Sequence, residues 1–141
     1  MSFVKIWIHA VWSTKNRQDF LIKEIRNTIF PHIHSNGLKK GILIDIIYGY
    51  SDHVHRLFRL RNDRTIQRTI QLLKGESFYW INQEKLTREK FSWQSEYFAI
   101  SVSESLVEVV RNYIRKQEEH HKKKSFQQEY DEFITKYNFE V

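Results

Sequence analysis

The feature that most constrains the fold is an ordered alternation between strand-like and helix-like segments. Residues 3–12 alternate with a period of two, as a β-strand with two different faces does. Residues 42–50 are rich in β-branched side chains, and the turn 49–52 leads into a further strand at 53–60, so these segments predict a hairpin. A fourth strand is predicted at 97–102.

Helical spacing of apolar residues marks the segments between and after these strands. Residues 21–36 and 65–84 predict helices, and Pro31 should kink or divide the first. Ser103 is a candidate N-cap for a helix to about residue 122, and 125–137 predict a last short helix. The order predicts an α+β, ferredoxin-like β-α-β-β-α-β sheet with an appended C-terminal helix, in a single domain of residues 1–141.

Composition narrows the function classes. Hydrophobic residues make up 40% of the 141 residues, and 23 Lys+Arg against 17 Asp+Glu give a net charge of +6, which favours a polyanionic partner. The absence of cysteine excludes disulfides, thiol nucleophiles and zinc–thiolate sites. No apolar run approaches the roughly 20 residues that cross a bilayer. The N-terminus does not look like a signal peptide, so no membrane association and a cytoplasmic location are expected.

The motif His53-Val54-His55 is the strongest chemical signal. On a strand, the side chains of His53 and His55 project on one side and Val54 on the other. Neutral imidazole is a common metal ligand, so the pair can form half of a metal site. The alternative, two histidines on a solvated strand face, is the more frequent outcome for an arbitrary motif of this kind.

A second constellation lies in the helix predicted after residue 103. Tyr113 and Gln117 are four residues apart and share one helical face. If that face lies over the histidines, Gln117 can offer a carbonyl oxygen to Mg²⁺ or Mn²⁺, and Tyr113 a nucleophilic oxygen. Taken alone, a tyrosine on an amphipathic helix more often serves packing.

The remaining polar signals are weaker. His32 and His34 lie about 200° apart on a helix and cannot chelate together. Residues 120–121 are expected to be solvated or capping, His9 structural, and residues 118–119 part of a solvated face. Basic residues interleaved with aromatic ones suit phosphate contacts and base stacking, although each alone fits an ordinary surface.

Several motifs in order carry a resemblance over nearly the whole chain. They are Val11-Trp12-Ser13-Thr14-Lys15-Asn16-Arg17, Gly49-Tyr50-Ser51-Asp52-His53-Val54-His55, Leu73-Lys74-Gly75-Glu76-Ser77, Trp93-Gln94, Tyr97-Phe98-Ala99-Ile100-Ser101-Val102-Ser103 and Val110-Arg111-Asn112-Tyr113-Ile114. The chain resembles the HUH-type, single-tyrosine transposases of bacterial insertion sequences, the insertion-sequence-200-like group. U stands for the hydrophobic residue between the histidines.

The resemblance implies a ferredoxin-like sheet with a tyrosine-bearing C-terminal helix, and a role for each matching residue. His53, His55 and Gln117 would bind a divalent metal, Mg²⁺ or Mn²⁺, and Tyr113 would be the nucleophile. The phenolate would attack a phosphodiester of single-stranded DNA, leaving a 5′-phosphotyrosine and a free 3′-OH. That hydroxyl would then rejoin strands without hydrolysis or ATP.

The resemblance also implies partners. Members of the family bind DNA hairpins near element ends and work as homodimers, in which the tyrosine helix of one subunit completes the histidine pair of the other. Lys15, Asn16 and Arg17 are the leading hairpin-contact candidates, followed by Arg59 and Lys74.

One departure and two alternatives stay open. Arg56 stands where an apolar residue is common, but it lies on the face away from the ligands, so no loss of chemistry is expected. A non-catalytic ferredoxin-like DNA-binding module would use the same basic surface, although it would not need the histidines, Tyr113 and Gln117. A domesticated relative that cleaves hairpins would have the same catalytic core as a transposase. Only the flanking DNA would distinguish the two, because hairpin-bearing ends close to the gene favour a mobile element.

Overall fold

A computed structural model describes residues 2–137 and has an α+β fold built on a four-stranded antiparallel sheet. The strands are β1 (Trp7–Ser13), β2 (Leu43–Gly49), β3 (His53–Arg59) and β4 (Phe98–Val102). Their order is β2-β3-β1-β4, so β3 and β1 are central. This order and the two crossover helices confirm the fold predicted from the periodicities.

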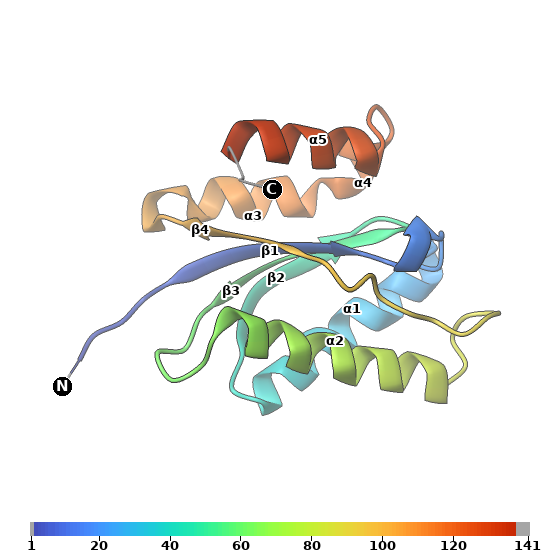
Figure 1. The fold of residues 1–141 in the computed structure, drawn as a ribbon, viewed down its shortest axis with the longest axis horizontal. Helices are drawn as coiled ribbons and strands as arrows, with labels where there is room; N and C mark the ends of the chain where they lie inside the picture. The colour runs from blue at the N-terminus through green and yellow to red at the C-terminus, as the bar shows by residue number, and fades with distance from the viewer. Residues whose placement is uncertain (1, 138–141) are drawn as a thin grey trace.

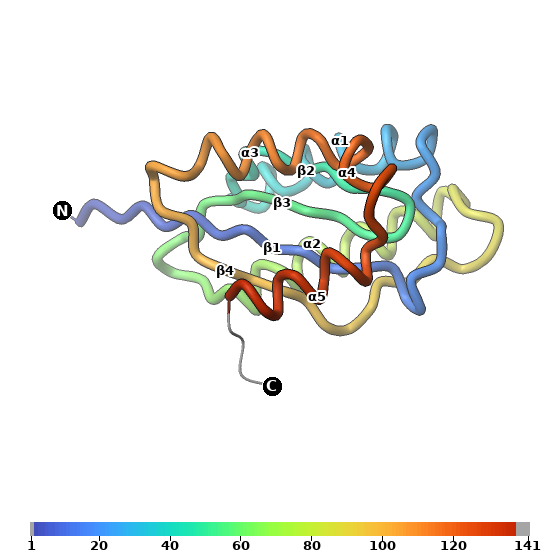
Figure 2. Tube along the Cα trace, turned by 90° about the horizontal axis from the view of Figure 1, so that it is seen from above, coloured from blue at the N-terminus to red at the C-terminus, as the bar shows by residue number. Residues whose placement is uncertain are grey.

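Helices cover both faces of the sheet (Figure 1). One face carries α1 (Lys23–Lys39) and α2 (Ile66–Gln83), and the other carries α3 (Val107–Arg115), α4 (Gln117–His121) and α5 (Phe126–Tyr137). Seen from above, α3 follows β2 and β3, while α5 lies over β1 and β4 (Figure 2). No helix in the described part of the chain is long and apolar enough to cross a bilayer.

The main hydrophobic core lies between the sheet and the pair α1 and α2. Its buried members include Ile8, Ala10, Trp12, Ile29, Ile33, Val54, Phe58, Ile70 and Leu73. The strand residues in this list all have even numbers, because alternate side chains of a strand point to one face. The opposite face holds a smaller cluster under α3 and, beside it, the histidine pair.

The structure corrects several predicted boundaries. The first strand begins at Trp7, and Phe3 is 90% exposed. Helix α1 continues past Pro31 to Lys39. Pro31 has no N–H to donate to the carbonyl oxygen of Asn27, but both residues are exposed, so water can donate to that oxygen instead. The helix predicted from residue 103 to 122 is divided: a 3₁₀ turn at Glu104–Leu106 precedes α3, and a break at Lys116 separates α3 from α4.

An ion pair anchors α3 to the edge strand of the sheet. The register of β2 shifts between Ile44 and Ile46, so Asp45 occupies an irregular position. Its two carboxylate oxygens accept from Arg111 Nε and Nη2 at 2.7 and 2.8 Å. Because this contact is bidentate, it fixes the orientation of α3 as well as its distance. Tyr113 follows two residues later.

Candidate active site and metal centre

His53 and His55 project together from β3 toward α4 and α5, as the strand alternation predicts. Both side chains are fully buried, so the alternative of a solvated histidine pair is wrong. In the register, Ser13 of β1 lies opposite His53, and Val11 lies opposite His55. The pair therefore stands on a central strand, β3, which is hydrogen-bonded to β2 on one side and β1 on the other.

The second ring nitrogen of each histidine has a partner that orients the ring. His53 Nδ1 lies 2.8 Å from Asp52 Oδ1, to which it donates. His55 Nδ1 lies 2.9 Å from His9 Nε2. Such contacts on the far nitrogen are typical of metal-binding histidines and direct the Nε2 atoms to a common centre. His9, predicted to be structural, therefore positions His55.

Gln117 reaches the same centre from α4. Its side chain is fully buried, and its Oε1 lies 2.9 Å from His53 Nε2. Tyr113 and Gln117 both face the histidines, as predicted, although the helix between them is interrupted at Lys116. Both side chains still reach the histidines, since α4 resumes directly after the break and is held by its own contacts.

Glu118 supplies one of those contacts. Its Oε1 accepts from Arg26 Nη2 at 2.9 Å and from the hydroxyl of Tyr48. These bonds join α4 to α1 and β2, and they lower the pKa of the Glu118 carboxyl. The interpretation of Glu118 as part of a solvated face is therefore wrong. Glu118 holds the turn of helix that carries Gln117.

Two further residues enter the centre that the sequence did not single out as ligands. Glu129 of α5 is 1% exposed, and its Oε1 lies 3.1 Å from His55 Nε2 and 3.5 Å from His53 Nε2. His121 Nε2 lies 3.0 Å from Gln117 Oε1, and the His121 side chain is 2% exposed; of the two predicted roles, solvated or capping, the first is therefore wrong, and His121 Nδ1 contacts the backbone oxygen of Lys124 at 2.7 Å. One signal was available: Phe126 and Glu129 are three residues apart, which places an acid on the apolar face of α5.

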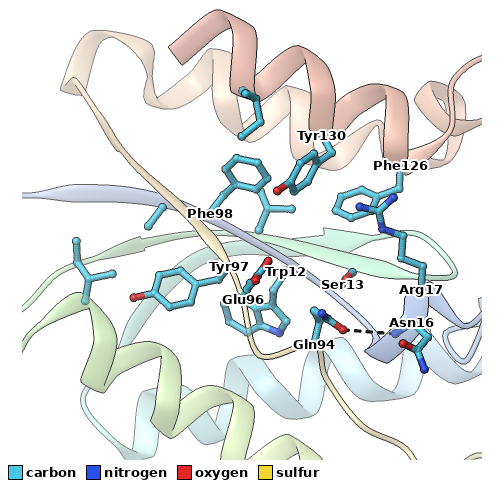
Figure 3. Close-up of a pocket in the computed structure, with 14 residues that line it drawn as sticks. Trp12, Ser13, Asn16, Arg17, Gln94, Glu96, Tyr97, Phe98, Phe126 and Tyr130 are labelled. Carbon is cyan, nitrogen blue, oxygen red and sulfur yellow. Dashed lines mark hydrogen bonds between the residues drawn. The ribbon is translucent and has the colours of Figure 1, made fainter. Parts of the chain in front are cut away.

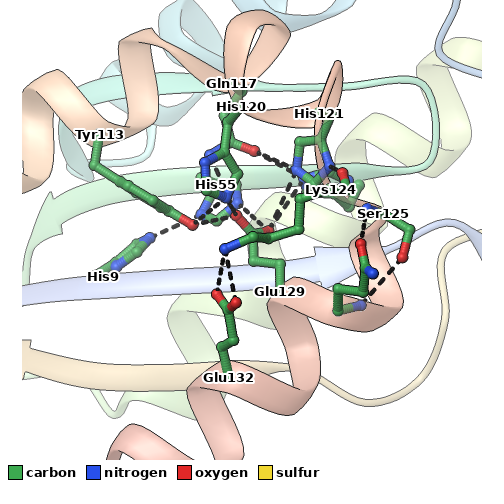
Figure 4. A network of polar contacts seen from close by, with 12 residues as sticks. His9, His55, Tyr113, Gln117, His120, His121, Lys124, Ser125, Glu129 and Glu132 are labelled. Carbon is green, nitrogen blue, oxygen red and sulfur yellow. Dashed lines mark hydrogen bonds and ion pairs between the residues drawn. The ribbon is translucent and has the colours of Figure 1, made fainter.

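In Figure 4 the side chains of His55, Gln117, His121 and Glu129 point toward one another. The group His53, His55 and Glu129 can hold a metal ion, and Gln117 Oε1 adds a neutral oxygen. Neighbouring ligands of one octahedral Mg²⁺ lie about 3 Å apart, since each is roughly 2.1 Å from the ion. The separations of 2.9, 3.1 and 3.5 Å fit that arrangement. The residues present therefore suit a divalent cation.

The protonation states agree with this chemistry. Burial lowers the pKa of His55 to about 4, although Glu129 opposes the shift. Burial and the neighbouring His55 lower the pKa of His9 to about 3. Burial by itself would raise the pKa of Glu129, but His55 and His121 reverse the effect, and the pKa falls well below its usual range. Neutral imidazoles and an ionised carboxylate are the metal-binding forms.

Tyr113 approaches the centre from α3. Its ring centroid lies 5.7 Å from that of His55, its hydroxyl donates to Glu129 Oε2, and His120 Nε2 is 3.4 Å from the same hydroxyl. Burial and the negative charge of Glu129 raise the pKa of Tyr113 far above its ordinary value. The phenol is therefore held protonated, with a carboxylate beside its proton.

The predicted DNA-contact residues do not form one patch. Lys15, Asn16 and Arg17 lie just past the end of β1 that faces His53, whereas Arg59 lies at the opposite end of the sheet, across from Trp7. The Lys74 Nζ atom is occupied by the backbone oxygens of residues 94 and 95, at 2.5 and 3.2 Å. The loop 15–17 and the Lys74 ammonium, which is 5.6 Å from the Trp12 ring centroid, therefore lie near the histidine end of the sheet, and Arg59 does not.

The sequence of this chain matches a known family, and the match includes the buried histidine pair, Tyr113 and Gln117. The IS200-like transposase family matches residues 2–117, which is most of the chain. The chain belongs to this family. The match ends at Gln117, so α5 and its Glu129 lie beyond it.

Solved structures agree with this assignment at the level of the fold. A crystal structure of a protein described as a transposase from Deinococcus radiodurans R1 superposes on this IS200-like transposase with a TM-score of 0.67 at 21% identity, covering 82% of this chain and 93% of the other. A REP-associated tyrosine transposase bound to a REP hairpin superposes with a TM-score of 0.62 at 15% identity, covering 86% and 72%. No curated protein matches the chain.

Proposed function

We propose that this IS200-like transposase cleaves and rejoins single-stranded DNA next to a hairpin, with Tyr113 as the nucleophile and with His53, His55 and Gln117 as metal ligands. The observation that carries the proposal is the convergence of two buried imidazole Nε2 atoms and the Gln117 Oε1 atom beside the Tyr113 hydroxyl. A passive DNA-binding module would not need buried ligand atoms of this kind, since their burial costs free energy unless they are paired.

Each residue has a defined part in the proposed reaction. The Tyr113 oxygen forms a bond to phosphorus while the bond from phosphorus to the 3′-oxygen breaks, which gives a 5′-phosphotyrosine and a 3′-OH. The Tyr113 proton passes to Glu129 Oε2, to which the hydroxyl already donates, and is delivered through solvent to the leaving 3′-oxygen. A divalent cation, Mg²⁺ or Mn²⁺, would supply Lewis-acid stabilisation of charge on the phosphate. In the reverse step a 3′-OH displaces Tyr113, so the phosphodiester energy is conserved.

The burial of the centre sets a condition on this reaction. The side chains of His53, His55 and Glu129 are at most 1% exposed. The scissile phosphate therefore finds room beside the metal ligands only when Glu129 Oε1 gives up its place between the two Nε2 atoms. We propose that DNA binding moves Glu129 Oε1 away from the Nε2 atoms, while Oε2 keeps its bond to Tyr113 and α5 stays in place.

The nucleophile is tested with an end-labelled hairpin oligonucleotide that carries single-stranded flanks. The wild type should form a labelled covalent adduct that survives denaturing electrophoresis in the presence of Mn²⁺. Tyr113→Phe should lose the adduct and retain hairpin binding, because it removes one oxygen and keeps the ring. An adduct on Tyr113→Phe would exclude this residue as the nucleophile, and undiminished cleavage by His53→Ala in EDTA would exclude the metal role.

Hairpin binding and dimer formation belong to the same proposal. The hairpin carried by the REP-associated relative supports the first. Dimer formation rests on the family resemblance alone, because one chain already contains Tyr113 and both histidines in contact range. Mixing Tyr113→Phe with His53→Ala protein decides the point: recovered adduct would mean that the sites are shared between subunits, and none would mean that each chain uses its own tyrosine.

A further inference from the structure

The sheet edge opens next to the candidate active site. β4 pairs with β1 up to Phe98, opposite Val11, and the next backbone bond joins Gln94 N to Ser13 O at 2.9 Å. One residue of β1, Trp12, therefore faces a three-residue arch, 95–97. Because the arch is longer than the strand it spans, it must bend away from the edge.

This opening leads into a cavity of about 870 Å³ (Figure 3). The volume is within the roughly 300–1,000 Å³ range of small-ligand sites, and it exceeds what one side chain would fill. Aromatic side chains line it from two directions: Tyr97 and Phe98 from the arch and β4, and Phe126 and Tyr130 from α5. Trp12 also lines it, and the buried Nε1 of this residue finds no acceptor among residues 2–137.

The rim of the cavity is polar and carries a cation. The Arg17 guanidinium lies 5.2 Å from the Phe126 ring centroid and 5.4 Å from that of Tyr130. Asn16 and Arg17 both adopt a left-handed backbone conformation, with φ of 56° and 54°. Non-glycine residues rarely do so, and such strain gathers at functional sites. Gln94 and Glu96, also at the rim, can pair with the edge of a base.

The cavity and the metal centre share a wall. The Phe126 ring stacks on His53, with 4.3 Å between centroids and 17° between planes, and it also lines the cavity. A flat occupant of the cavity would therefore lie one side chain away from His53, a proposed ligand of the metal at the scissile phosphate. That separation suits the base of an adjoining nucleotide.

We infer that the cavity binds one unpaired nucleobase of the DNA strand that is cut, next to the scissile phosphate, with Arg17 at the backbone phosphate. The inference rests on the proposed function for the position of this base. Stacking on the aromatic walls supplies affinity that tolerates different bases. The net charge of +6 attracts the same strand.

The inference is tested with a random-sequence 20-nucleotide single strand in which thymidine is replaced by 5-iododeoxyuridine. Irradiation of its complex with the full chain, followed by mass spectrometry, should place base adducts on Tyr97, Phe98, Phe126 or Tyr130. In fluorescence anisotropy, Tyr97→Ala should bind the strand at least about fivefold more weakly than the wild type. The matched control is Tyr79→Ala on α2, which should bind like the wild type because Tyr79 is 64% exposed and does not line the cavity.

Adducts confined to other surfaces, or equal affinities of the Tyr97 and Tyr79 variants, would overturn the inference. The proposed cleavage can fail separately. If the wild type forms a phosphotyrosine but no base adduct in the cavity, the nucleobase site is wrong and the nuclease stands. If base adducts form in the cavity but the wild type forms no phosphotyrosine, the chain binds an unpaired base there without cutting it.

Discussion

Replacing Arg56 with methionine should stabilise this protein. The Arg56 side chain is fully buried on the sheet face opposite the histidines, and its guanidinium carbon lies 3.4 Å from the Trp12 ring centroid. None of its three side-chain nitrogens has a hydrogen-bond partner within the part of the chain that the structure describes. Burial lowers the pKa of Arg56 well below its ordinary value, the direction expected for an unpaired charge.

The size of the effect follows from opposing contributions. Transfer of a charged group out of water costs several kcal/mol after relaxation. The contact with Trp12 returns about 2 kcal/mol, the upper range for a desolvated cation–π pair. Methionine keeps an unbranched chain against the indole, where sulfur–aromatic contact contributes about 0.3–1.5 kcal/mol. The net gain is about 1–3 kcal/mol, which raises Tm by roughly 3–10 °C.

Urea unfolding and thermal melts of the wild type and Arg56→Met measure this difference directly. The matched control is Arg59→Met, on the same strand but half-buried on the other face, which should change stability by no more than about 0.5 kcal/mol. Adduct formation should stay unchanged in Arg56→Met, because the residue lies away from the ligands. A loss of 1 kcal/mol or more would refute the reasoning, since it would mean that the guanidinium is paired.

Two further predictions concern the metal centre. Glu129→Gln keeps the shape of the side chain but removes an anionic ligand. The affinity for Mn²⁺, measured by calorimetry, should therefore fall by at least roughly 10–100-fold, the loss typical of changes to residues that only contact a metal ligand. Unchanged affinity would exclude contact between Glu129 and the metal. Gly49→Ala should cost about 1–3 kcal/mol and weaken Mn²⁺ binding, because the new Cβ would collide with the His53 backbone across the hairpin. Gly75→Ala is its control, since nothing lies within 4 Å of that Cβ, and equal metal affinity in the two variants would disprove the argument.

Features that depend on nearest neighbours along the chain could be predicted well. The placement of His53 and His55 on one side of β3, with Arg56 on the other, follows from the two-residue period of a strand. The order of strands and helices follows from the spacing of apolar residues. Boundaries were less predictable, because the exposure of Pro31 and the break at Lys116 depend on what surrounds each helix.

The sequence by itself determined the histidine pair, the element order and, through the run of family motifs, the roles expected of Tyr113 and Gln117. Only the tertiary structure brought Glu129 to His55, across 74 positions of the chain, and showed that the centre is buried. It also placed Arg59 far from the loop 15–17, because the antiparallel register of β1 and β3 puts them at opposite ends of the sheet. The physical reason is that periodicity reports backbone geometry over a few residues, whereas the meeting of distant segments depends on how whole faces pack.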